Sequence, residues 1–257
     1  MDKAGIIASL ETSGAIISAS INRNGWFSVC TQEGDATRGV VTVYNDEGKA
    51  VYRVNLATGY VLSSEISQDN RSIAVLNLTD SGSRITYCEL SSGNIDRNYV
   101  LPDSLIIEIR YLTSGDVLAL STDALFVVGK TGEKEDIYDF SGKRLNNYSL
   151  DSGLISLHLL DYGVGHRGRI AVFDAGRNLL GEIDINAEVI SISSGDNYVA
   201  ILKSDGITIY DEALEEMMLF DDFSSAAGAA KVLALGNSSV LTASDHSAVV
   251  QKLTGGL

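Results

Sequence analysis

The chain has 257 residues, of which 45% are hydrophobic, so it can bury a sizeable core and a disordered chain is excluded. Its formal net charge is −15, from 34 acidic and 19 basic residues. An acidic surface of this kind repels phosphate groups, so binding to nucleic acid or to an anionic membrane surface is not expected.

β-Strands are predicted from the N-terminus onward, because apolar and polar residues alternate in short runs and helical periodicity is nearly absent. The first group has four runs, at residues 15–21, 26–30, 39–44 and 50–56. Similar groups follow at 61–101, 106–140, 144–185 and 188–222, and the last group, at 229–253, has only three runs. One proline and 25 glycines suit a sheet protein with many tight turns.

A polar turn separates the first and second runs of every group, at Asn22, Ser67, Thr113, Asp151, Ser193 and Gly236. The turns recur at intervals of about 38 to 46 residues, and four antiparallel strands in a repeat of this length predict a β-propeller blade. We therefore predict an all-β, six-bladed β-propeller, one domain over residues 1–257, with blades that begin near residues 14, 59, 104, 143, 188 and 228.

Closure of this ring is predicted from the incomplete last repeat. The run "AGIIASL", residues 4–10, can supply the missing fourth strand. Pairing the N-terminal strand with the C-terminal blade would leave no blade without a neighbour and no apolar face exposed.

Two segments leave alternatives open. In residues 134–150, the sequence "DFSGKR" fits a turn between two blades, but also a turn between the third and fourth strands of one blade. Residues 211–235 contain enough Ala, Leu, Met and Glu for a turn or two of helix, although the strands around them favour a longer connection.

Three segments, "GVVTVYNDEGKAVYRVNL", "GYVLSSEISQDNRSIAVLNL" and "LKSDGITIYD", resemble a bacterial family that is catalogued as a domain of unknown function. The resemblance covers residues 14–253 and implies a WD40-like or quinoprotein-like propeller. It also implies a place outside the cytoplasm, because many members carry an N-terminal membrane helix. No such helix precedes the strands here, so the anchor is expected to be trimmed away or absent. The family brings no catalytic residues.

Signatures of specific chemistry are not found. One tryptophan and three histidines cannot supply the Gly-His and Trp-Asp pairs of WD40 repeats, and no P-loop, HExxH, GxSxG or GxGxxG motif stands in a fitting context. His166 and His246 are expected in separate blades, and Cys30 and Cys88 in apolar runs as small buried hydrophobes. No catalytic residue, metal site, disulfide or cofactor is therefore predicted.

One loop gathers basic groups on this acidic chain. In "DYGVGHRGR", residues 161–169, His166, Arg167 and Arg169 flank glycines, as in a loop that binds an anion or a partner. An ordinary solvated loop accounts for the same residues more simply.

The first strand of each propeller blade lines the central channel, and three charged residues are predicted there: Glu65, Glu108 and Arg110. Glu108 and Arg110 are two residues apart, so they share one face of a strand. Hydrated channels are ordinarily polar, but paired carboxylates could also serve glycoside hydrolysis.

Two classes of function follow. The first is a binding or scaffold module for a protein, peptide or glycan partner, placed outside a bacterial cell and tethered to its surface, with the cytoplasm as the alternative location. The second is a hydrolase or lyase at the mouth of the channel. The missing catalytic signatures favour the binding module, because a fold by itself implies no activity.

Overall fold

The computed structural model describes residues 9–33, 39–56, 59–151, 153–163, 165–195, 197–220, 228–236 and 238–253. Within these ranges the regular elements are β-strands, and no helix is long and apolar enough to cross a membrane. The chain divides into two compact units, Met1–Asp139 and Phe140–Leu257, and each is described by itself.

The first unit holds three antiparallel four-stranded sheets whose strands pair in chain order. The first sheet consists of β1 (Ala15–Ile21), β2 (Phe27–Gln32), β3 (Gly39–Tyr44) and β4 (Ala50–Asn55). The second consists of β5 (Tyr60–Ile66), β6 (Ser72–Thr79), β7 (Gly82–Glu89) and β8 (Ile95–Leu101). The third consists of β9 (Ile106–Tyr111), β10 (Val117–Ser121), β11 (Ala124–Val128) and β12 (Lys134–Asp139).

The second unit repeats this plan twice and then adds a shorter sheet. Its first sheet consists of β13 (Lys143–Leu150), β14 (Leu154–Asp161), β15 (Arg167–Asp174) and β16 (Leu179–Asn186). Its second consists of β17 (Val189–Ser194), β18 (Tyr198–Lys203), β19 (Gly206–Asp211) and β20 (Glu216–Phe220). Its last has three strands in the described residues, β21 (Lys231–Leu235), β22 (Ser239–Ala243) and β23 (Ala248–Lys252).

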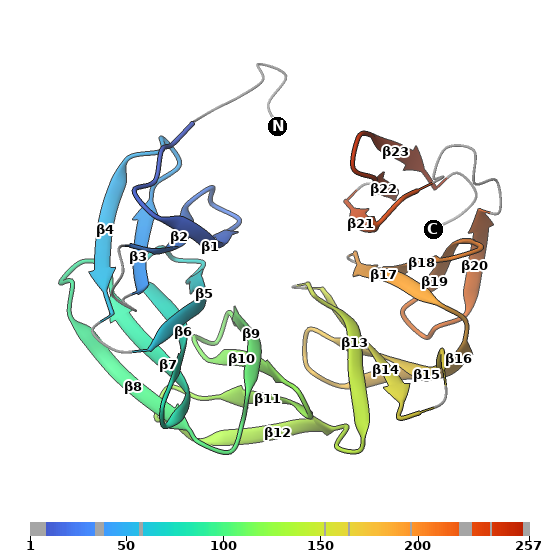
Figure 1. Ribbon diagram of the computed structural model, residues 1–257, viewed down its shortest axis with the longest axis horizontal. Helices are drawn as coiled ribbons and strands as arrows, with labels where there is room; N and C mark the ends of the chain where they lie inside the picture. Colours follow the sequence, from blue (N-terminus) through green and yellow to red (C-terminus); the bar gives the residue numbers. More distant parts are fainter. Residues whose placement is uncertain are drawn as a thin grey trace. The chain divides into compact units, whose positions relative to one another are not determined.

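Neighbouring sheets meet through their first strands in both units. In the first unit β1 lies against β5 and β5 against β9, and in the second β13 lies against β17 and β17 against β21 (Figure 1). The first strands of each unit therefore run side by side, and their side chains can form one surface.

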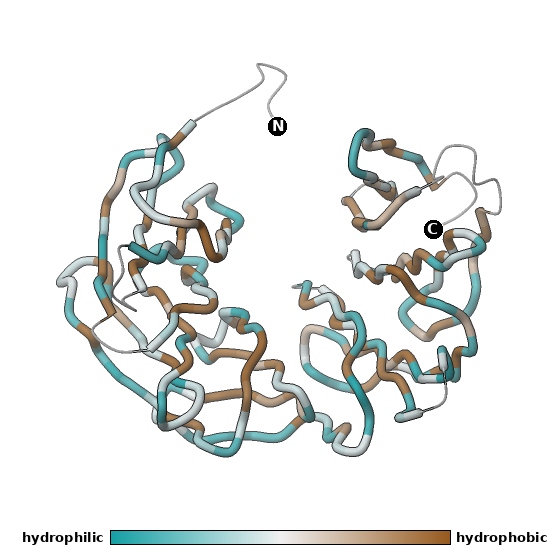
Figure 2. The backbone as a smooth tube through the Cα atoms, in the orientation of Figure 1, coloured by the Kyte–Doolittle hydropathy of each residue, from teal (hydrophilic) through white to brown (hydrophobic). Residues whose placement is uncertain are grey.

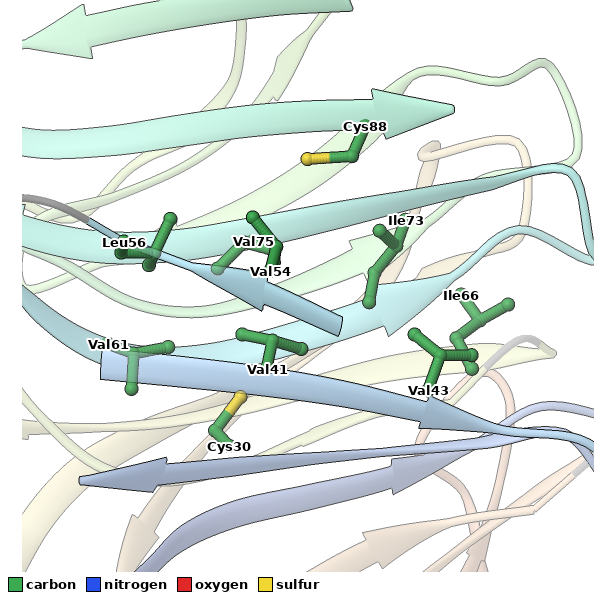
Figure 3. Packing of buried hydrophobic residues seen from close by; sticks show 10 residues of the cluster. All are labelled: Cys30, Val41, Val43, Val54, Leu56, Val61, Ile66, Ile73, Val75 and Cys88. Carbon is green, nitrogen blue, oxygen red and sulfur yellow. The ribbon is translucent and has the colours of Figure 1, made fainter. Parts of the chain in front are cut away.

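The core is divided into layers between successive sheets. One cluster, shown in Figure 3, joins Cys30, Val41 and Val43 of the first sheet to Ile73 and Val75 of the second. The alternate residues of β6, Ala74 and Leu76, face the third sheet instead. Because both faces of a middle sheet are buried, its inner strands are hydrophobic along their length rather than on one side only.

The fourth strands differ from the middle strands. Figure 2 shows hydrophobic stretches in β10 and β11 and a more hydrophilic trace in β12. The same contrast appears in the burial of the side chains, since every residue of β10 is buried and none of β12 is. The middle strands hold the layers together, while most side chains of the fourth strands are exposed or half-buried.

Turns between third and fourth strands share one hydrogen-bonding pattern. Asn45 Oδ1 accepts hydrogen bonds from the backbone N–H groups of Glu47 and Lys49. Asp211 Oδ1 accepts from those of Ala213 and Glu215 in the same way. This Asx turn explains why a strand followed by Asn or Asp recurs along the sequence.

Each four-stranded sheet carries a β-bulge in its first strand and another in its fourth. The extra residues of the first strands are Ile17, Leu62, Ile107, Asn146 and Ile190. Those of the fourth strands are Val51, Asp96, Ile137, Leu180 and Met217. Bulges bend an edge strand and discourage further pairing. In the three-stranded sheet, the pairing of β21, β22 and β23 is regular.

The predicted all-β class and the antiparallel four-stranded repeat are confirmed. In residues 134–150, β12 ends one sheet and β13 begins the next, so "DFSGKR" is the turn between two sheets. In residues 211–235, Glu216–Phe220 forms β20, whereas residues 221–227 lie outside the described ranges. The closing strand predicted at residues 4–10 also lies outside them, except for Ser9 and Leu10.

Candidate functional site

A cavity of about 240 Å³ opens among the three first strands of the first unit. Serine, glutamate and arginine side chains line it together with aliphatic ones. The lining residues are Ser18, Ala19 and Ser20 of β1, Leu62, Ser63, Ser64 and Glu65 of β5, and Ile107, Glu108, Ile109 and Arg110 of β9.

The repeat places these residues in rows across the three strands. Glu65 follows Ser20 by 45 residues, and Arg110 follows Glu65 by the same number. These three residues hold equivalent positions, three residues after the bulge in β1, β5 and β9. Because equivalent positions in adjacent strands lie side by side, the spacing of 45 residues brings Ser20, Glu65 and Arg110 into one row.

Arg110 joins the two carboxylates of the cavity. Its Nη1 donates to Glu65 Oε1, and its Nη2 lies 2.9 Å from Glu108 Oε1. The hydroxyl of Ser20 also donates to Glu65 Oε1, at 2.6 Å. Glu65, Glu108 and Arg110 lie on first strands, β5 and β9, and Arg110 brings the two carboxylates together. Glu65 is the carboxylate with two partners, Arg110 and Ser20.

Burial differs among the three charged groups. The side chain of Glu65 is 13% exposed, that of Glu108 24% and that of Arg110 40%. Burial raises the pKa of the Glu65 carboxyl above its usual value, while Arg110 and the Ser20 hydroxyl oppose that rise by stabilising the charged form. The balance leaves Glu65 easier to protonate than a carboxylate in water.

Beneath the charged row lies a layer of small polar groups. Ser64 Oγ donates to Ser28 Oγ at 2.9 Å and lies 3.1 Å from the buried thiol of Cys30. The buried Oγ of Ser63 has no hydrogen-bond partner among the described residues. Burial raises the pKa of the Cys30 thiol, which keeps it protonated and unreactive.

The bulges place aliphatic side chains, Leu62 and Ile107, at the cavity, and we call these two residues its apolar margin. Each is the extra residue of a bulge. Ile107 is 36% exposed, and Ile17, at the matching position of β1, is 44% exposed. A bulge re-aims a side chain, and here it places aliphatic groups beside carboxylates.

The other predicted binding residues lie elsewhere, in the second unit. His166 is exposed in the turn after β14, whereas Arg167 and Arg169 belong to strand β15 rather than to a loop. Arg167 Nε lies 3.1 Å from Asp161 Oδ2, and Arg169 reaches Asp184 at 3.1 Å and Glu182 at 3.3 Å. Each arginine is thus already paired with a carboxylate.

The histidines form no common site. His158 is buried in β14, while His166 and His246 are exposed in separate sheets. Cys30 and Cys88 are free, buried thiols of β2 and β7. No group of three or more His, Cys, Asp or Glu side chains that could hold a metal occurs in the part of the chain that the structure describes.

Two features of the cavity were missed from the sequence, although each left a signal there. Ser20 stands 45 residues before Glu65, which marks it as the third member of the row. The bulges coincide with paired aliphatic residues before a polar one, "IIS", "VLS", "IIE" and "VIS" in β1, β5, β9 and β17. Such a pair breaks strict strand alternation, and that break marks the extra residue.

Comparison with solved structures defines the class of protein. The chain matches Hsv2 of Kluyvelomyces marxianus with a TM-score of 0.70 and 12% identity, over 95% of this chain and 74% of that one. It matches Hsv2 of Kluyveromyces lactis with a TM-score of 0.67 and 14% identity, over 95% and 76%. Hsv2 is a β-propeller, so the fold of this chain is a β-propeller with a charged cavity on its first strands.

Within that class, the chain belongs to the family described as "Family of unknown function (DUF5711)", whose model matches residues 1–220. The search of curated proteins found no match. The resemblance to a propeller family of unknown function is confirmed to that extent.

Proposed function

We propose that the protein is a binding module that holds a segment of a partner protein at the cavity between β1, β5 and β9. The observation that carries this proposal is the arrangement of the cavity: charged, hydroxyl and aliphatic side chains are fixed on three adjoining strands. Rigid strands hold such groups in place before a partner arrives, which lowers the entropic cost of binding.

The same charged groups also define the alternative, a hydrolase or lyase, because Glu65 has a raised pKa and Glu108 lies beside the same arginine. Binding is favoured over catalysis by the position of Arg110. Its guanidinium contacts both carboxylates, so each is already held in an ion pair, whereas a general acid or base must be able to reach a substrate.

We further propose six blades, closed by a strand from residues 4–10. The open edge of β23 supports this, because within the described residues the sixth sheet has three strands whereas each of the other five has four. A strand edge without a partner is a template for another strand. The segment named from the sequence has the composition to fill it.

A location outside the cytoplasm of a bacterial cell, with a tether at the surface, is part of the same proposal and rests on the resemblance described above. Protease treatment of intact cells of the native organism tests it. Digestion of the protein at the surface is expected, and full protection until the cells are lysed would place it in the cytoplasm instead.

Selection from a random peptide library displayed on phage tests the binding function, with a glycan array run in parallel on the whole chain. Peptides that bind the wild type and not Ala19→Trp are expected. Ala19 is exposed and lines the cavity, so the indole fills the cavity without removing a buried contact.

Ala15→Trp is the matched control, because Ala15 is exposed on the same strand and does not line the cavity. This variant should bind the selected peptides as the wild type does. Glycans retained in place of peptides, with the same dependence on position 19, would contradict a protein partner. Turnover of chromogenic glycosides that is lost in Ala19→Trp would favour the hydrolase.

A further inference from the structure

We propose that the cavity between β1, β5 and β9 takes a basic side chain, lysine or arginine, from the partner segment. This inference rests on the proposed function, because it names the chemistry that the same cavity recognises.

The charges of the cavity do not balance. Two carboxylates, Glu65 and Glu108, face one guanidinium, that of Arg110, so an ionised cavity carries one negative charge in excess. Both hydrogen bonds to Glu65 converge on Oε1, and within the described residues Oε2 receives none. A cation that enters the cavity adds the missing charge and provides a donor for a carboxylate oxygen.

The net charge of the whole chain also favours a positively charged ligand. Its net charge of −15 attracts cations and repels anions over distances longer than the cavity itself. An anion would have to compete with Glu65 and Glu108 for Arg110 while both carboxylates repel it. A basic group meets neither obstacle.

The apolar margin fits the rest of a basic side chain. Lysine and arginine carry a hydrocarbon stem that packs on apolar surface while the charged end reaches polar groups. Leu62 and Ile107 supply such a surface beside Glu65 and Glu108. A small metal cation or ammonium would leave these aliphatic groups unused.

The size of the cavity agrees with one side chain rather than a larger ligand. Pockets for drug-sized molecules measure about 300–1,000 Å³, and this cavity measures about 240 Å³. The rest of the partner segment would then lie outside it, along β1, most of whose residues are exposed.

A titration of the ¹⁵N-labelled whole chain with three probes of equal carbon number tests the inference. The probes are n-butylammonium, n-butanol and butyrate, which present one four-carbon chain with positive, zero and negative charge. Butylammonium is expected to shift the amide signals of Ser63, Glu65 and Ile107. It should bind at least about tenfold more tightly than butanol, as a charge-assisted hydrogen bond requires.

The double variant Glu65→Gln, Glu108→Gln should reduce the butylammonium response to that of butanol. Glu182→Gln is the matched control, since this carboxylate pairs with an arginine outside the cavity, and its response should equal that of the wild type. If the double variant does not fold, a loss of the butylammonium preference at high salt in the wild type carries the same information.

Equal binding of butanol and butylammonium, or tighter binding of butyrate, would overturn the inference. If no probe shifts these amides while the displayed peptides still need an open cavity, the basic side chain is wrong and the binding function stands. If the displayed peptides also ignore the Ala19→Trp substitution, both fall.

Discussion

His158 shows how burial changes a single titratable group. It is 1% exposed, its Nδ1 lies 3.2 Å from Asn146 Nδ2, and its buried Nε2 has no hydrogen-bond partner among the described residues. Burial, with the charge of Arg144 as the second cause, lowers the pKa of this imidazole to about 4. His158 is therefore neutral in the folded protein at pH values where an exposed histidine is charged.

This shift makes stability depend on pH. The unfolded chain takes up a proton near pH 6.5 and the folded chain only near pH 4, so stability is complete above pH 6.5 and falls as the pH drops toward 4. Between pH 7 and pH 4 the wild type should lose about 3 kcal/mol more unfolding free energy than His158→Gln, which does not titrate.

Urea denaturation of both proteins across this range measures the difference. Parallel stability curves for the wild type and His158→Gln would show that His158 is charged in the folded state.

Contacts between individual side chains were the least predictable from the sequence. The positions of Glu65, Glu108 and Arg110 on first strands follow from the repeat. Their joint contact depends on the Arg110 side chain reaching from β9 to Glu65 on β5 as well as to Glu108 on its own strand, which strand patterns do not encode. For Arg167 and Arg169, the run of basic residues gives no sign of the carboxylates that pair with them.

Among the elements, the first strands have a second role: short polar side chains tie one sheet to the next. Ser191 Oγ of β17 accepts a hydrogen bond from the backbone N–H of Val232 in β21 at 3.2 Å. Ser193 Oγ accepts from that of Ala234 at 2.9 Å. Serine can serve here because it satisfies backbone groups on an edge that no further strand covers.

Ser191→Ala should therefore cost about 1–3 kcal/mol of unfolding free energy, since Ser191 and Val232 are both buried and the N–H of Val232 loses its acceptor. Faster hydrogen exchange at the Val232 amide should accompany the loss. Ser204→Ala is the control, because Ser204 is exposed after β18, and it should change stability little. Equal effects of the two substitutions would argue against this link between sheets.

Strand positions were predictable because each middle strand must be hydrophobic on both faces, which leaves a strong pattern in sequences such as that of β6. Bulges were not predicted, because one extra residue changes register without changing composition. The break in alternation at Ile16 and Ile17 is present in the sequence, but only the pairing with β2 shows that it is a bulge.

For the whole molecule, the repeat predicts the propeller class, and the comparison with Hsv2 confirms it. The number of blades and the closure of the ring stay predictions, because they depend on the segment before Ser9. If the proposed closure is right, the N-terminal segment forms the fourth strand of the last sheet, and the stability of that sheet depends on it.

Deletion of Met1–Ser13 should lower the thermal midpoint of the whole protein by several degrees, because it removes a strand that would seal the last sheet. Trp26, the single tryptophan, packs against the core of the first unit, so its fluorescence follows that unit. Far-ultraviolet circular dichroism follows both units.

Coincident transitions by the two methods are expected in the full chain, with both shifted downward in the truncated one. Unchanged midpoints after truncation would contradict the closure. A chain that lacks residues 254–257, which lie beyond the last predicted strand, controls for loss of length alone.

The regular spacing of the first-strand bulges offers a landmark for comparing distant members of this family. Leu62 follows Ile17, and Ile107 follows Leu62, by 45 residues, whereas the turns around them vary in length and composition. Alignments anchored at the doubled aliphatic pair would keep inward- and outward-facing positions in phase even where identity is low. They would show directly which relatives have an acid at the position of Glu65, three residues beyond the bulge of β5, and which have another residue there.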